Sequence, residues 1–187
     1  MAITGLVGVR AAEIGKNGFQ NPFHVGDAMT SNITITMAEG SLYANNRRKE
    51  HKQRFDSGSI ELGVDDLIDT VQAKLFGHAT KKITVGAKTV TVNVSNETDL
   101  CPNIGLGFYQ TVVRNDVDKY RVIILLKTQF AEPTDNAQTA DNNITMSGRT
   151  TTGTIMSDDN GDWKYDVTVD TEEEAEAVLD AVLGKIV

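Results

Sequence analysis

The chain has 187 residues and a formal net charge of -8, with 26 acidic and 18 basic side chains. This balance favours solubility and opposes a role in wrapping nucleic acid, which requires neutralisation of phosphates. The length supports one domain, residues 1–187, with enough apolar residues for a core. Cys101 is the only cysteine, so no intrachain disulfide can form, and a reducing compartment fits.

Composition also indicates the fold class and the compartment. Thr, Val and Asn are plentiful and only two segments look helical, which predicts a mainly β (α+β) protein. No apolar run approaches the roughly 18 residues that a membrane span needs, and the N-terminus lacks a signal-peptide pattern. We therefore expect a soluble protein that is made in a cytoplasm and does not enter a membrane.

The N-terminal part of the chain alternates predicted strands with polar segments. Residues 2–14 form a predicted first strand, and residues 15–31, with their Gly, Asn and Pro, form a predicted long loop. Residues 32–38 alternate apolar and polar side chains, which is typical of a half-buried strand.

Residues 45–55, NNRRKEHKQRF, are a basic run in an acidic protein. We expect a long loop or arm over residues 43–55. Its basic side chains are candidate contacts between subunits: Arg47, Arg48, Lys49, Lys52 and Arg54. One interpretation is a patch that meets an acidic surface on a neighbouring subunit, or nucleic acid; the other is a solvated loop or strand edge. The lack of interleaved aromatics disfavours nucleic acid.

A strand over residues 57–62 leads into a predicted helix. Asp65 or Asp66 is expected to cap the helix, and Gly77 to end it. Its predicted apolar stripe consists of Val64, Leu67, Ile68, Val71 and Leu75. Residues 81–95 follow as a predicted hairpin that turns near Gly86.

Residues 104–133 contain the longest apolar run in the chain and form the predicted spine of an antiparallel sheet. Two strands, over 104–113 and 120–130, flank a polar turn at 115–118. The second strand is apolar on both faces at its midpoint, which indicates a central strand covered on both sides. Gly105 and Gly107 leave room for a close neighbour or a bulge.

The C-terminal part is predicted to be loop, hairpin and helix. Residues 132–143 form a predicted loop or arm, and residues 144–157 a strand. Asn160-Gly161 predicts a type I′ hairpin turn into a strand with one buried face, carrying Trp163, Tyr165, Val167 and Val169. Thr171 and Glu174 predict a capping box at the start of a terminal helix. Its inward stripe is expected to consist of Ala175, Val178, Leu179, Val182 and Ile186.

Candidate catalytic and ligand-binding groups are sparse. The histidines His24, His51 and His78 lack metal-ligand spacing and are interpreted as surface or loop residues. Cys101 lies in no nucleophile motif. The Asp-rich segment 158–162 does not match a calcium loop and is interpreted as a turn. We therefore expect no catalytic residue, cofactor or metal, and a protein that is not an enzyme.

The string GLGFYQTVVRNDVDKYRVIILLKTQFAEP, residues 105–133, resembles the signature of the major tail protein, or tail tube protein, of long-tailed phages with non-contractile tails. Further matches follow the family in order: SLYAN (41–45), SGSIELGVDDL (57–67) and GTIMSDDNGDW (153–163). The basic run 45–55 departs from the family, in which we expect more acidic residues.

The resemblance implies a structural virion protein. Its fold would be an antiparallel, barrel-like β-sandwich flanked by one or two helices, with six copies per ring and rings stacked into a tube. DNA would pass through the tube without specific binding. Partners would be further copies of the chain and the tape measure, tail terminator and distal tail proteins. Assembly would occur in the host bacterial cytoplasm, with loops 15–31, 47–54 and 132–143 bridging rings.

Two other classes of function fit parts of the sequence. A secreted or surface β-sandwich that binds sugar or protein would explain the Thr/Asn-rich loops, although loop aromatics for sugar stacking are scarce. A tail terminator or another tube-like protein would share the architecture, and only residues 108–133 favour the main tube subunit. The acidic residues between 158 and 182 are either a solvated helix face or a partner for the basic run of another subunit.

Overall fold

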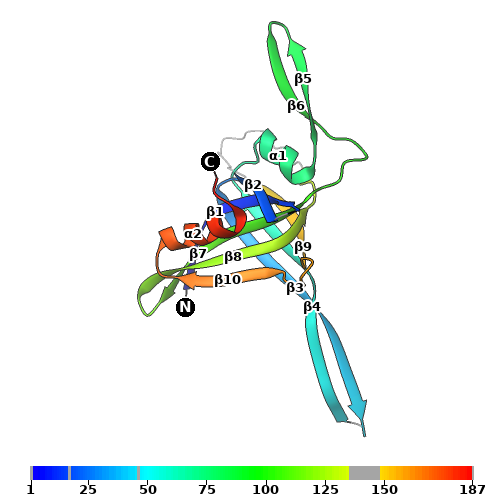
Figure 1. The fold of residues 1–187 in the computed structure, drawn as a ribbon, viewed down its shortest axis with the longest axis vertical. Helices are drawn as coiled ribbons and strands as arrows, with labels where there is room; N and C mark the ends of the chain where they lie inside the picture. The colour runs from blue at the N-terminus through cyan, green and yellow to red at the C-terminus, as the bar shows by residue number, and fades with distance from the viewer. Residues whose placement is uncertain (1, 17, 46, 135–147, 187) are drawn as a thin grey trace, which may run out of the picture.

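The computed structural model describes residues 2–16, 18–45, 47–134 and 148–186. In these ranges antiparallel strands dominate and two helices flank them, which confirms the mainly β, sandwich-like prediction (Figure 1). The strands are β1 Ala2–Gly15, β2 Gly18–His24, β3 Ala28–Ala44, β4 Arg47–Val64, β5 Ala79–Val85, β6 Lys88–Val94, β7 Asn103–Arg114, β8 Val117–Phe130, β9 Arg149–Met156 and β10 Lys164–Val169; the helices are α1 Asp69–Phe76 and α2 Glu172–Leu183.

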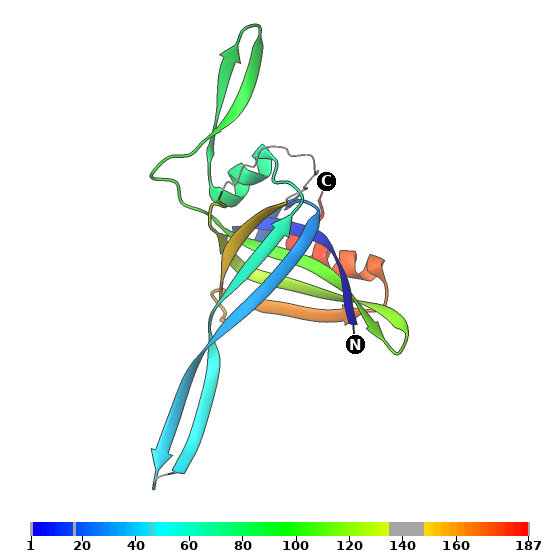
Figure 2. The same cartoon turned by 180° about the vertical axis from the view of Figure 1, so that it is seen from behind.

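The main sheet runs in the order β2-β1-β7-β8-β9-β4-β3, and β10 also pairs with β8. The edge of β8 opposite β7 is shared, since β10 pairs with residues 120–125 and β9 with residues 127–130. The sheet curls so that β4 and β9 pack across a shared apolar core against β1, β7 and β8 (Figure 2). The predicted spine is confirmed, and Asn115 and Asp116 make its turn with positive φ.

The middle of β8 is covered on both faces, as its sequence predicts. Ile123 and Leu125 belong to the core between the two sides of the curled sheet. Val122, Ile124 and Leu126 point the other way, into a second cluster beneath α2. Alternation along one strand therefore supplies both apolar layers.

Helix α2 begins with the predicted capping box: the Thr171 hydroxyl accepts a hydrogen bond from the Glu174 N–H, and the Glu174 carboxylate accepts one from the Thr171 N–H. Its buried residues are Ala175, Leu179 and Leu183. Gly107 explains how α2 lies so close to the sheet, because a Cβ there would be 2.6 Å from Leu179 Cδ2. The predicted close neighbour of Gly107 is thus a helix, whereas the side chain nearest to Gly105 is Phe19 of β2.

Helix α1 begins later than predicted. Its N-cap is Ile68, which makes no side-chain capping bond, so neither Asp65 nor Asp66 caps it. Asp65 instead accepts a hydrogen bond of 2.8 Å from the Asp27 N–H and holds the start of β3. Ile68, which was predicted to belong to the apolar stripe, is 57% exposed, so that part of the prediction is wrong. Gly77 ends the helix in the left-handed region, as predicted.

The predicted loop at residues 15–31 is wrong. Residues 15–31 contain β2, whose Phe23 is buried in the core. Pro22 lies in an edge strand, where a missing N–H is tolerated, so the Gly/Pro signal was misleading. Residues 43–55, predicted to be a long loop or arm, lie in an arm, which is the end of a long hairpin formed by β3 and β4.

The predicted hairpin at Asn160-Gly161 is also wrong. Only Gly161 of the pair has positive φ, and β9 and β10 pair with different parts of β8. The turn is held by Asp158, whose carboxylate accepts hydrogen bonds from the backbone N–H groups of Asn160 and Asp162. An Asx turn thus replaced the type I′ turn.

The predicted segment 132–143 falls largely outside the described residues, as does the start of the predicted strand 144–157, of which β9 is the described part. Neither described helix has the length and apolar character that crossing a membrane requires.

Candidate assembly surfaces

The most conspicuous surface is the β3–β4 arm, residues 37–55, which extends away from the body (Figure 1). Strand pairing continues along it from Met37↔Phe55 to Ala44↔Arg47. The arm carries all the basic side chains singled out in the sequence, and each is exposed: Arg47, Arg48, Lys49, Lys52 and Arg54. The candidate contacts are therefore gathered on one projecting element.

The strand pairing changes register near the tip of the arm, among these basic residues. Leu42 pairs with Glu50 and Tyr43 with Arg48, which leaves Lys49 bulged out of the ladder. Lys52 forms an exposed ion pair of 3.4 Å with Glu50. Among the described residues it is the only one of the five basic side chains with an ion-pair partner. Leu42 and Tyr43 beside them are 57% and 67% exposed, so the tip is both basic and apolar.

A second hairpin, the β5–β6 arm (residues 79–94), projects from the other end of the molecule (Figure 1). It confirms the predicted hairpin at Gly86, which has φ +63°. Register alternation puts Ile83, paired with Val90, on one face and the Thr84–Thr89 pair on the other. The apolar face is exposed at four positions: Ile83, Val85, Val90 and Val94.

The base of the β5–β6 arm contains a histidine that sequence reasoning placed on the surface. The His78 side chain is only 6% exposed; its Nδ1 lies 3.3 Å from Asp99 and its Nε2 3.4 Å from Glu132. The N–H of Asn96 and then His78 hold the pKa of the Asp99 carboxyl below its usual value. Asp99 and Glu132 are distant from His78 in sequence, so no local motif could have revealed the group.

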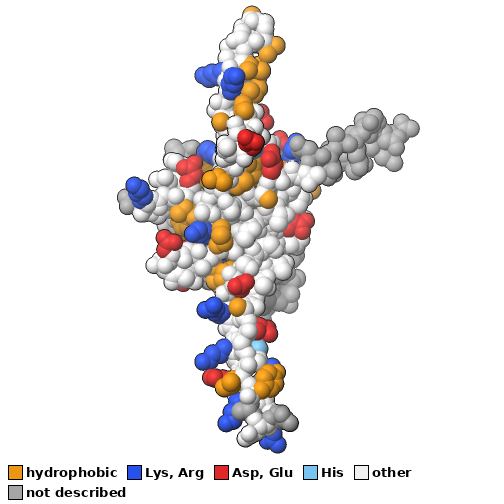
Figure 3. Space-filling model, turned by 90° about the vertical axis from the view of Figure 1, so that its right-hand side faces the viewer, with side chains coloured by type: hydrophobic (Ala, Val, Ile, Leu, Met, Phe, Trp, Pro, Cys, Tyr) orange, Lys and Arg blue, Asp and Glu red, His pale blue; other side chains and the backbone are white. Residues whose placement is uncertain are grey.

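Charge is divided between the arms and the body. The β3–β4 arm has five basic and two acidic residues, and the β5–β6 arm has three lysines and no acidic residue. The rest of the chain contains 10 basic and 24 acidic residues. Figure 3 shows Lys and Arg along both projections. Two arms therefore repel each other, as do two bodies, whereas an arm attracts the body of another copy.

Open sheet edges are the third feature. Among the described strands, β3 pairs only with β4, so its other edge has no strand partner over Ala28–Ala44. The outer edge of β10 is likewise open, and Tyr165 and Val167, predicted to be buried, are 46% and 42% exposed. That correction has a physical cause, because α2 covers β8 and leaves this part of β10 uncovered. Unpaired edges of this kind are templates for another chain.

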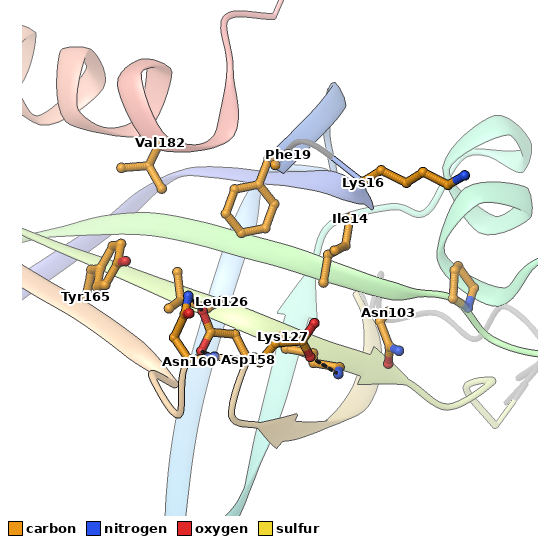
Figure 4. A pocket seen from close by; sticks show the side chains of 13 residues that line it. Ile14, Lys16, Phe19, Asn103, Leu126, Lys127, Asp158, Asn160, Tyr165 and Val182 are labelled. Carbon is orange, nitrogen blue, oxygen red and sulfur yellow. Dashed lines mark hydrogen bonds and ion pairs between the residues drawn. The ribbon is translucent and has the colours of Figure 1, made fainter.

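A groove of about 840 Å³, here called the lateral groove, lies beside α2 (Figure 4). Apolar side chains from β1, β2, β8, β10 and α2 line it, in that order Ile14, Phe19, Leu126, Tyr165 and Val182. Asp158, Asp159 and Lys127 lie together on one part of its rim, where Lys127 Nζ is 4.0 Å from Asp159 Oδ1, and Lys16 lies on another (Figure 4). The groove brings together residues that are far apart in the sequence.

Comparison with known proteins adds no family assignment. No protein-family model matches the chain, and no curated protein sequence matches it.

The remaining candidate groups are not brought together. His24 and His51 are exposed, and His51 Nδ1 lies 2.9 Å from the Ser41 hydroxyl on the arm. Burial, followed by the nearby Glu132, raises the pKa of the Cys101 thiol, which keeps it protonated at neutral pH. Within the described ranges no three His, Cys, Asp or Glu residues form a group that could hold a metal ion.

Proposed function

We propose that the chain is the main tail tube subunit of a phage with a long, non-contractile tail. In this proposal it is a structural virion protein that self-assembles into hexameric rings, and the stacked rings form the conduit for DNA. The observation that carries the proposal is β3: 17 residues long, open along one edge, and continued into an arm that exposes Leu42 and Tyr43. An isolated hairpin of this kind is marginally stable in water unless something covers it.

Head-to-tail association of copies would use these features together. Joining open edges around a closed rotation gives every copy the same contacts and pairs each joined edge with a neighbouring copy. The basic arms and acidic body favour arm-to-body contacts over contacts between like surfaces. The candidate contacts on the β3–β4 arm would then meet the acidic surface of a neighbouring copy.

The acidic body also suits a conduit. A wall that neutralised phosphates would bind DNA and hold it, whereas a net-negative wall repels DNA over roughly a Debye length. The proposed partners at the ends of the tube are the tape measure, tail terminator and distal tail proteins, and the proposed location is the virion tail.

Shortening the β3–β4 arm tests this function. Residues 38–54 are replaced by Asn-Gly, which closes the hairpin beyond the Met37↔Phe55 pair and leaves the body intact. We expect a folded monomer by circular dichroism and sedimentation, with loss of rings and tubes. Gly40→Ala is the control, because its added methyl group has nothing within 4 Å. Unchanged assembly of the shortened chain would contradict the proposal.

A further inference from the structure

We propose that the apolar face of the β5–β6 arm of one copy docks in the lateral groove of a second copy. This inference rests on the proposed self-assembly and names a contact within it. The arm supplies an apolar strip of Ile83, Val85, Val90, Val92 and Val94, in which only Val92 is half-buried by its own chain and the other four are exposed. Its strands have seven residues each, which gives a strip roughly 23 Å long.

The lateral groove is one of the places where the body leaves apolar side chains uncovered. Ile14 is 42% exposed and Tyr165 46% exposed on its walls, and Val167 follows on the same face of β10. Under α2 this apolar layer is closed by Ala175 and Leu179, but beyond the helix it continues without cover. A partner that presents aliphatic side chains would complete the layer.

The charges of the arm and of the groove favour arm-to-groove contacts over arm-to-arm contacts. Lys81 and Lys88 lie on the same face of the arm as the apolar strip, because they pair with Val92 and Val85. Two arms placed face to face would bring four lysines together, which disfavours an arm-to-arm dimer. The turn beside the groove carries Asp158, Asp159 and Asp162. Lys127 offsets one of these charges at 4.0 Å from Asp159, so the turn keeps a net negative charge and offers the arm opposite charge.

The chain does not fill its own groove. The β5–β6 arm leaves the body beyond α1 and points away from it in both ribbon views, whereas the groove lies beside α2 (Figures 1 and 2). An arm that docks in the groove must therefore come from a second copy.

Disulfide trapping between two differently tagged proteins tests the contact. Both carry Cys101→Ser, which removes the only native cysteine; one adds Val90→Cys and the other Tyr165→Cys. On mild oxidation we expect a covalent heterodimer as the main product. The matched control replaces Val90→Cys by Thr91→Cys, the adjacent residue on the polar face, and we expect at least fivefold less heterodimer. Circular dichroism checks that each variant is folded.

Each alternative outcome has a defined meaning. Equal trapping at both arm positions, or a predominance of Val90→Cys homodimers, would overturn the docking in the groove. A second part of the experiment changes charge. Lys88→Glu should reduce trapping several-fold, and Asp159→Lys in the partner should restore it. Tubes that form normally without any trapping would contradict only this contact, whereas absence of all self-association would contradict the proposed function itself.

Discussion

Phe55 and Trp163 stack face to face, with ring centroids 4.6 Å apart and planes 4° from parallel. Phe55 is the last residue of the β3–β4 arm, and Trp163 leads into β10. The Lys164 ammonium lies 5.1 Å from the Trp163 ring and adds a cation–π contact. The stack therefore ties the base of the arm to the edge strand that flanks it.

Replacement of this tryptophan is expected to loosen the arm. Trp163→Ala removes the stack and a half-buried indole, and we expect the free energy of unfolding to fall by about 2 kcal/mol. Trp163→Phe keeps a stacking partner and should lose less than half as much. Urea unfolding followed by circular dichroism measures both, and equal losses would show that stacking is not the cause.

The ion pair between Arg10 on β1 and Asp180 on α2 is expected to matter for stability because Arg10 is only 8% exposed. Asp180→Ala leaves this guanidinium buried without its carboxylate, so we expect a loss of about 3 kcal/mol in the free energy of unfolding. The double variant with Arg10→Met should recover part of that loss. Additive losses in the double-mutant cycle would contradict a direct coupling between the two residues.

Asp166 is expected to make stability depend on pH. Its hydrogen bonds from Arg121, followed by those from Lys164, hold the pKa of the carboxyl below the usual 3.8. A lowered folded-state pKa means that the stabilisation is complete above pH 3.8 and disappears as the pH falls through the folded-state value. Asp166→Asn should therefore cost about 0.5 kcal/mol at pH 7 and nothing at strongly acid pH. Urea midpoints across this range measure the difference; a constant difference would contradict it.

Assembly is expected to weaken with salt and with charge reversal on the β3–β4 arm. The Arg48→Glu/Lys52→Glu variant removes two positive charges and adds two negative ones where we expect an acidic neighbour. We expect at least a tenfold higher concentration for half-assembly at 50 mM salt, and a smaller difference at 1 M, where charges are screened beyond about 3 Å. The control Ser41→Ala/Gln53→Ala alters uncharged arm residues. Equal effects of the two variants would rule out a charge mechanism.

The period-two pattern of apolar residues was sufficient to predict the central strands. Val122 to Leu126 are all buried in β8, as the sequence predicts, because a strand covered on both faces has no polar side at its middle. Local signals also identified the capping box at Thr171 and the end of α1 at Gly77. In each of these cases the deciding interaction lies within a few residues along the chain.

The arms and the groove depend on contacts that no local pattern contains. The polar, basic residues 45–55 carry no local pattern that separates a loop from an arm or a strand edge, because the β structure of residues 47–55 rests on pairing with residues 37–44 and not on burial. Tyr165 and Val167 alternate like a buried strand, yet they are exposed because no element of the same chain covers them. Both differences arise where burial within the same chain does not determine the structure.

Purified wild-type protein, studied by sedimentation and by negative-stain microscopy at increasing concentration, tests self-assembly most directly. We expect rings of about six copies at moderate concentration and hollow tubes of stacked rings above it. A homogeneous monomer that persists at the highest soluble concentration, with its body folded, would contradict self-assembly as the function of this chain.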